Sequence, residues 1–201
     1  MPVIPASATD SASDDIVYAY KPSLIGAPFE FRLTQGGLEW HKGGRAGRTS
    51  YARIRRIRLS FRPATMQNHR FVAEIWPVDG PRLPIASTSW RSMAEQERLD
   101  QPYRAFVVEL NRRVGEAGGT PLLQTGSPPL LYWPGLVVFV VAALSFAALI
   151  VRALLVEAWS GAAFIAAFLA LFLWQAGTFF RRNRPGTYRA EAVPDTVLPK
   201  D

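Results

Sequence analysis

Two long uncharged apolar segments constrain this chain more than any other feature. Residues 130–151 and residues 159–180 each contain 22 residues without a single Asp, Glu, Lys, Arg or His. A helix of that length spans about 33 Å, which is enough to cross the hydrocarbon core of a bilayer. Two such helices buried in a soluble protein of 201 residues would need a larger apolar core than the rest of the chain can build. The sequence therefore predicts an integral membrane protein with two passes.

The connection between these segments, residues 152–158, is too short to hold a domain, so the sequence predicts an antiparallel transmembrane hairpin. Three basic residues follow the second segment, namely Arg181, Arg182 and Arg184, whereas the connection contains only Arg152. By the positive-inside rule, these topology determinants place both ends of the hairpin in the cytoplasm. The first residues show neither the basic nor the apolar region of a signal peptide, which agrees with that orientation.

Small residues recur at four-residue spacing in both apolar segments, as Ala143 and Ala147 in the first and Ala162, Ala166 and Ala170 in the second. Such faces let helix backbones approach closely in lipid. We expect them to pack within the hairpin, and they leave homo-oligomerisation open. Because no ionisable residue lies inside either segment, the hairpin is predicted to be an anchor and not an ion or proton pathway.

The region before the hairpin shows the alternation that is typical of β-strands. Residues 29–33 and 38–40 alternate around a Gly-containing turn, which predicts a hairpin. Residues 57–61 and 71–76 alternate as well, and residues 84–90 give a weaker strand.

The apolar period then changes to that of a helix over about residues 102–114. Its predicted buried face consists of Tyr103, Phe106, Val107, Leu110 and Val114. Glu109 and Arg113 are spaced to pair across one turn of this helix.

About five strands followed by one closing helix resemble a pleckstrin-homology-like domain. The plan of the chain is similar to that of short bacterial proteins that join such a domain to a transmembrane pair. The resemblance covers about residues 27–114 and rests on the order and length of the elements, without a residue motif. It implies an α+β fold: a small antiparallel β-barrel or sandwich with a C-terminal helix, followed by the two-helix hairpin in a bacterial inner membrane. A generic small β-barrel or sandwich with one helix is the alternative.

Composition predicts the remaining segments. Residues 1–26 begin with a Pro-, Ala-, Ser- and Asp-rich stretch, which indicates a disordered N-terminal lead. Residues 27–114 are the predicted cytoplasmic domain, residues 115–129 a flexible linker, residues 130–180 the hairpin, and residues 181–201 a disordered cytoplasmic tail.

The strongest functional signal is a run of basic residues. Nine basic residues and no acidic residue lie between positions 42 and 70. A domain held beside the membrane would gain roughly 1 kcal/mol per basic residue from an anionic leaflet. The candidate contacts to anionic lipid or to a protein partner are Lys42, Arg45, Arg48, Arg53, Arg55, Arg56, Arg58 and Arg62. A solvated cationic face without a ligand is the alternative. Nucleic acid is disfavoured because only Tyr51 and Phe61 supply aromatic platforms among these charges.

Residues 41–50, HKGGRAGRTS, combine glycine, arginine and hydroxyl groups in a mixture that suits phosphate. The spacing is not that of a P-loop. We therefore expect this segment to be a loop whose backbone amides form an anion-binding nest.

Catalysis has little support in the sequence. The chain contains no cysteine, and its two histidines, His41 and His69, have no evident acid or nucleophile beside them. No catalytic residue, metal ligand or cofactor is therefore assigned. The sequence predicts a membrane-anchored, non-enzymatic protein that presents a basic cytoplasmic domain to lipid or to a partner, in a regulatory or scaffolding role. The alternative is an accessory or assembly subunit of a larger membrane complex, held through its hairpin.

Overall fold

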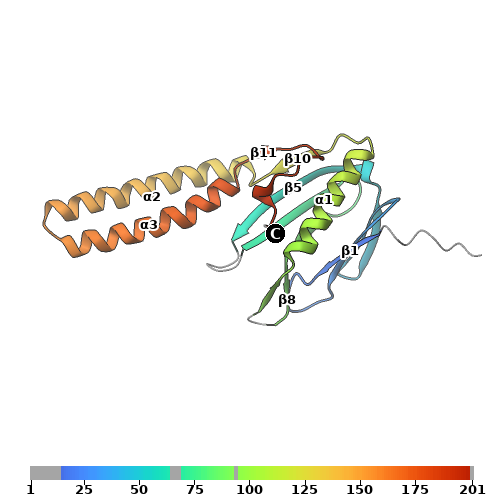
Figure 1. Ribbon diagram of the computed structural model, residues 1–201, viewed down its shortest axis with the longest axis horizontal. Coiled ribbons are helices and arrows are strands. Elements are labelled where there is room, and N and C mark those ends of the chain that lie inside the picture. The colour runs from blue at the N-terminus through green and yellow to red at the C-terminus, as the bar shows by residue number, and fades with distance from the viewer. Residues whose placement is uncertain (1–14, 64–68, 93–94, 200–201) are drawn as a thin grey trace, which may run out of the picture.

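The computed structural model of the chain describes residues 15–63, 69–92 and 95–199, and it combines a β-rich domain with a helical hairpin (Figure 1). One sheet is antiparallel and follows the chain order β1 (Ile16–Tyr20), β2 (Phe29–Thr34), β3 (Gly37–Lys42), β4 (Arg45–Thr49). The second has the order β11 (Gly186–Thr187), β10 (Leu122–Thr125), β5 (Ile54–Pro63), β6 (His69–Pro77), β7 (Leu83–Ala86). A short ribbon pairs β8 (Thr88–Trp90) with β9 (Gln96–Arg98). Two short 3-10 helices, η1 (Tyr51–Arg53) and η2 (Asp195–Val197), complete the domain.

The predicted β-hairpin, the predicted strands that follow it and the predicted helix at about residues 102–114 are confirmed. In the β2–β3 hairpin, Leu33 pairs with Leu38, and both side chains are fully buried. Helix α1 (Asp100–Glu116) buries the whole predicted apolar face. The Nε atom of Arg113 donates to Oε1 of Glu109 at 2.6 Å. Hydrogen bonds from Arg112 and from Arg113 hold the pKa of Glu109 at about 2.

Helix α1 lies between the two large sheets and closes the core with aromatic contacts (Figure 1). The rings of Tyr18 and Phe106 are 5.5 Å apart, and those of Tyr18 and Tyr103 are 6.2 Å apart. Phe31 adds an edge contact to Phe106 at 6.5 Å. One core is therefore shared by the helix and both sheets.

Within the described residues the sheets do not close into a barrel, so the barrel form of the predicted barrel or sandwich is wrong. The fold is α+β, with antiparallel sheets followed by two long helices. One pairing is parallel, because β10 lies beside β5 with Leu123 opposite Ile57.

The predicted N-terminal lead is wrong for residues 16–20, which form β1. Tyr18 and Tyr20 face the core and are almost fully buried. Each hydroxyl donates to a backbone carbonyl at 2.6 Å, Tyr18 to Ala86 and Tyr20 to Pro84. Residues 1–14 of the predicted lead lie outside the described residues.

The predicted flexible linker is wrong in its second half. Residues 122–125 form β10, which pairs with β5, and Leu123 is buried in the core. The strand carries only one core side chain, so the hydrophobic pattern of the segment is too weak to predict a strand.

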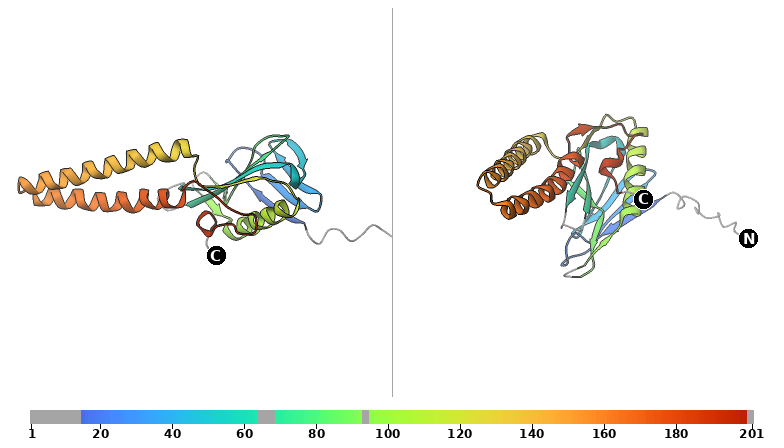
Figure 2. Two further views of the ribbon diagram at one scale, coloured as in Figure 1. Left: turned by 90° about the horizontal axis from the view of Figure 1, so that it is seen from above. Right: turned by 60° about the vertical axis from the view of Figure 1, so that its left-hand side comes forward.

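The predicted disordered tail is also wrong. After β11 the chain returns to α1 (Figure 2). Val197 and Leu198 of this segment are buried in the core. The hydroxyl of Tyr188 donates to Oδ1 of the buried Asn111 at 2.9 Å. The last described segment therefore completes the domain, and a fragment that ends before the hairpin would lack part of its core.

The hairpin consists of α2 (Pro129–Leu155) and α3 (Trp159–Arg182), which lie side by side and extend away from the sheets (Figures 1 and 2). Both helices are long and apolar enough to cross a membrane. Phenylalanine rings dominate their contact, with Phe139 and Phe172 5.2 Å apart and Phe146 and Phe168 5.3 Å apart.

The predicted small-residue packing within the hairpin holds only in part. Ala162 is buried, whereas Ala166 and Ala170 are exposed. Ala143 is half-buried, and Ala147 is exposed. The bulky phenylalanines leave little of the interface to these alanines.

Hydrogen bonds join both ends of the hairpin to the domain, and we call this set of bonds the clasp. Asn183 is fully buried, and its Oδ1 atom accepts from the amide of Phe61 at 3.1 Å. Its carbonyl accepts from the amide of Ser127 at 3.0 Å. The amide of Gly126 donates to the carbonyl of Leu59 at 2.7 Å. The hairpin is therefore an insertion between the paired strands β10 and β11, and both of its ends are tied to β5.

Candidate functional site

The surface between the five-stranded sheet and the base of the hairpin is hollowed into a groove of about 610 Å³. We call it the junction groove. Its lining residues are Arg58, Ser60, Phe61, Arg62, Glu74, Trp76, Arg82, Gly126, Ser127, Pro128, Leu131 and Phe179.

Strand β5 supplies the cationic floor of the junction groove. Its alternation turns Ile57 and Leu59 into the core, where both are fully buried. Arg56, Arg58 and Arg62 have the opposite parity and so project from the other face of the sheet. The strand therefore separates an apolar face from a basic face.

The neighbouring strand supplies an aromatic platform. Trp76 of β6 pairs with Arg56 of β5 in the sheet register. The guanidinium carbons of Arg56, Arg58 and Arg82 lie 5.4, 5.5 and 5.3 Å from the Trp76 ring centroid. Cation–π attraction therefore holds three cations around one indole.

One carboxylate lies among these arginines. Glu74 is 3% exposed; it accepts from Arg62 at 2.9 Å and is also bonded by Arg82. Arg58 instead donates to the amide oxygen of Gln124 at 2.9 Å. In the part of the chain that the structure describes, Arg56 and Arg58 form no ion pair.

The groove and its rim therefore hold four guanidinium groups against one carboxylate, a net charge of +3. Burial lowers the pKa of Arg58, and the positive charges of Arg56, Arg82 and Arg62 lower it further. An anion placed among these groups would relieve their mutual repulsion. The electrostatics of the groove thus favour a negatively charged ligand.

A buried hydroxyl group also borders the groove. Ser60 is 5% exposed, and its Oγ atom has no hydrogen-bond partner among residues 15–63, 69–92 and 95–199. A buried hydroxyl without a partner costs about 1–3 kcal/mol, so it is normally satisfied in a native structure.

The hairpin supplies an apolar wall. Pro128 and Leu131, from the start of α2, and Phe179, near the end of α3, line the groove beside its arginines. Leu131 is 71% exposed. The groove therefore joins a cationic floor to an apolar surface that continues along both helices.

The structure brings only part of the predicted basic run into this groove. Arg58 and Arg62 line it, and Arg56 lies on its rim through Trp76. Lys42 lies close by, because its Nζ atom donates to the carbonyl of Arg82 at 3.1 Å.

The other members of the run lie elsewhere, so the prediction of a single basic face is wrong. Arg48 pairs with Glu39 at 3.8 Å, and Arg53 pairs with Asp79. Strand β4 carries Arg45 at its exposed start, and an irregularity of the β5–β6 register leaves Arg55 exposed without a strand partner. Side chains alternate between the two faces of a strand, and turns reverse the chain. Basic residues that are close in the sequence therefore lie apart in the structure.

The predicted anion-binding loop at residues 41–50 is also wrong. Most of this segment belongs to the paired strands β3 and β4, where His41 lies opposite Ala46. Gly43 and Gly44 form the tight turn between them with φ angles of 55° and 77°. The ladder therefore uses the backbone groups that a nest would need.

The three predicted topology determinants lie at the base of α3. Arg181 and Arg184 are exposed, and the guanidinium carbon of Arg182 lies 4.9 Å from the Phe61 ring centroid. They therefore add positive charge where the hairpin meets the domain.

Sequence reasoning missed Trp76, Glu74, Arg82 and Ser60. The alternation of β6 places Glu74 and Trp76 on the face opposite the core. That alternation is the only feature of the sequence that could have indicated them as site residues. Arg82 lies outside the basic run, and Ser60 resembles any serine in a strand. Their proximity depends on the register of β5 with β6, which the sequence does not reveal.

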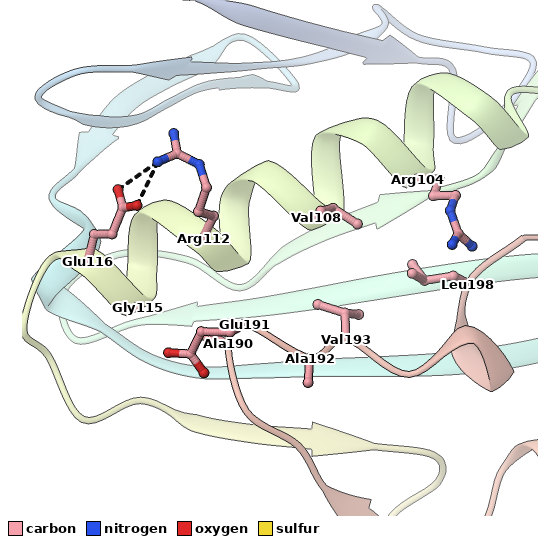
Figure 3. A pocket seen from close by; sticks show the side chains of 10 residues that line it. All are labelled: Arg104, Val108, Arg112, Gly115, Glu116, Ala190, Glu191, Ala192, Val193 and Leu198. Carbon is pink, nitrogen blue, oxygen red and sulfur yellow. Dashed lines mark hydrogen bonds and ion pairs between the residues drawn. The ribbon is translucent and has the colours of Figure 1, made fainter.

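A second groove, of about 550 Å³, lies between α1 and the returning chain (Figure 3). Its charges are compensated, because Arg104 pairs with Asp195 at 2.7 Å and Arg112 pairs with Glu116 at 2.7 Å. It therefore offers no net attraction for a charged ligand, and the junction groove is the better candidate.

No protein-family model, curated protein or solved structure matches this chain. Its architecture defines its class: an α+β domain with antiparallel sheets and two helices that could span a membrane. Within the described residues, no three His, Asp or Glu side chains gather as a metal site would require.

Proposed function

We propose that the protein is a membrane-anchored, non-enzymatic module that binds anionic lipid headgroups in its junction groove. The supporting observation is the excess of arginine at the base of a hairpin long and apolar enough to cross a membrane. A bilayer around α2 and α3 would bring lipid headgroups to the level of the groove. The proposed role is regulatory or scaffolding, with lipid contact positioning the domain.

We further propose that the groove and both chain ends lie on the cytoplasmic side of a bacterial inner membrane. The positive charge of Arg181, Arg182 and Arg184 supports this orientation by the positive-inside rule. The order of the elements, strands of two sheets followed by a helix, supports the resemblance to pleckstrin-homology-like domains. Strands β10 and β11 are additions to that plan.

The alternative role is that of an accessory subunit in a larger membrane complex. Ala166 and Ala170, exposed on α3, offer a face for close approach of another helix. Homo-oligomerisation through that face belongs to the same alternative.

Lipid binding should stabilise the full-length protein. In nanodiscs, replacing part of the phosphatidylcholine by phosphatidylglycerol should raise the Tm by several degrees, because a ligand that binds only the folded state stabilises it. The double variant Arg56→Gln/Arg58→Gln should lose most of this gain. It lowers the groove charge from +3 to +1 without breaking an ion pair. Intrinsic fluorescence during heating measures both quantities.

The matched control is Arg45→Gln/Arg55→Gln, which removes the same charge from exposed positions of the basic run. We expect it to retain the gain, and 0.5 M salt should weaken the gain in the wild type. Equal loss in both double variants would mean that net charge, and not the groove, attracts the lipid.

A further inference from the structure

We propose that the junction groove is a built site for one anionic phospholipid. In this arrangement the hydroxyl of Ser60 and the guanidinium groups of Arg58 and Arg82 hold the phosphate, while acyl chains follow Leu131 and Phe179. This proposal rests on the proposed function and narrows it from attraction to a charged surface to one lipid in a defined position.

Ser60 is the first reason to infer a defined site. Ser60 lines the groove, and its buried hydroxyl has no hydrogen-bond partner among the described residues. A phosphate oxygen is a strong acceptor for such a donor, and the hydrogen bond would be charge-assisted. Diffuse attraction to a membrane would not require a buried polar group at this position.

The two arginines provide the second reason. Arg58 and Arg82 lie at nearly equal distances from the ring of Trp76, at 5.5 and 5.3 Å. Stacking restricts both side chains before a ligand arrives, and each has a further partner, Gln124 for Arg58 and Glu74 for Arg82. Guanidinium groups that are held in this way can bind phosphate through two parallel hydrogen bonds, at a low cost in conformational entropy.

The start of α2 adds to the attraction. Ser127 and Pro128 line the groove, and the helix begins at Pro129. The N-terminal end of a helix carries a partial positive charge, which stabilises a nearby anion. The arginines, Ser60 and the start of the helix therefore line the same groove.

The apolar wall identifies the ligand as a lipid. Leu131 is 71% exposed and adjoins the arginines, and Phe179 lines the groove from the other helix. A soluble phosphate compound would leave this wall uncovered, whereas a lipid would cover it with acyl chain. A peptide with acidic side chains would gain less, because the wall continues along helices that lipid surrounds.

Native mass spectrometry of the full-length protein, purified from membranes of phosphatidylcholine and phosphatidylglycerol, tests this site. We expect one retained phosphatidylglycerol per wild-type chain. Ser60→Ala and Arg58→Lys should each lower the retained fraction at least about tenfold, as expected for the loss of one charge-assisted hydrogen bond. The matched controls Ser92→Ala and Arg45→Lys, at exposed positions, should retain the lipid as the wild type does.

Both groove variants keep the net charge, so they separate the defined site from general attraction. If they retain as much lipid as the wild type while phosphatidylglycerol still raises the Tm, the defined site is wrong and the proposed function stands. If phosphatidylglycerol does not raise the Tm of the wild type, both proposals fail. Full displacement of the lipid by 10 mM glycerol phosphate would also overturn the lipid site, because the apolar wall would then contribute nothing. A Tm of Ser60→Ala in phosphatidylcholine that equals or exceeds that of the wild type confirms that this variant folds, because the substitution removes an unpaired buried hydroxyl.

Discussion

Val197→Asp should abolish cooperative unfolding of the domain, whereas Thr196→Asp should change the Tm by no more than about 2 °C. Val197 is fully buried among the core residues, and Thr196, its neighbour in η2, is exposed. An unpaired carboxylate in the core costs several kcal/mol, which is comparable with the whole stability of a typical domain. Far-UV circular dichroism and limited proteolysis of the full-length protein in detergent measure the difference.

The two variants add the same charge to adjacent residues, so they test burial and not charge. A disordered tail would tolerate both substitutions equally. Equal behaviour would therefore contradict the role of the tail as part of the domain core.

Gly126→Ala should lower the Tm two to three times as much as Gly118→Ala. The two glycines have similar left-handed φ angles, 75° and 70°, so both variants carry the strain of about 1–2 kcal/mol for a side chain in that region. A Cβ atom at Gly118 meets nothing within 4 Å. At Gly126 it would lie 2.4 Å from the carbonyl oxygens of both Asn183 and Arg184, so the backbone must shift.

That shift would strain the clasp between the hairpin and β5, at an added cost of about 1–3 kcal/mol. Thermal unfolding measures the difference in Tm, and hydrogen exchange at the amide of Phe61 reports whether its bond to Asn183 persists. Equal Tm losses with a protected Phe61 amide would show that the close approach at Gly126 carries no cost.

Local patterns predicted the elements whose signals lie within a few residues of each other. The two helices of the hairpin follow from uninterrupted apolar composition, and α1 follows from a 3.6-residue apolar period. Strands β2, β3, β5 and β6 follow from alternation around turns. In each of these, one face or the entire element is apolar, so the pattern repeats often enough to be seen.

The elements that were missed are short and depend on distant partners. Strand β10 contributes one core side chain, Leu123, and owes its conformation to the edge of β5. Strand β1 lies in a polar neighbourhood, and its two tyrosines become core residues only when β2 and α1 are present. The tail contributes Val197 and Leu198 to a core whose other buried residues lie between positions 18 and 123.

The candidate site was predicted only in part for the same reason. The basic run includes Arg56, Arg58 and Arg62, which lie at the junction groove because arginines at alternate positions of a strand share a face. Trp76 and Arg82 join them through strand pairing between β5, β6 and β7, which no local pattern encodes. The location of the groove beside the hairpin depends on the clasp at Asn183, which is a single buried side chain.

Photo-crosslinking tests the central claim, that the junction groove contacts anionic headgroups, most directly. The full-length protein is reconstituted with a phosphatidylglycerol that carries a photoreactive group near its headgroup, and the attachment sites are mapped by mass spectrometry. The account predicts attachment at residues 56–62, 74–82 and 126–131, with much less attachment from the corresponding phosphatidylcholine probe. Attachment centred on residues 42–49, or the same pattern with both probes, would contradict it.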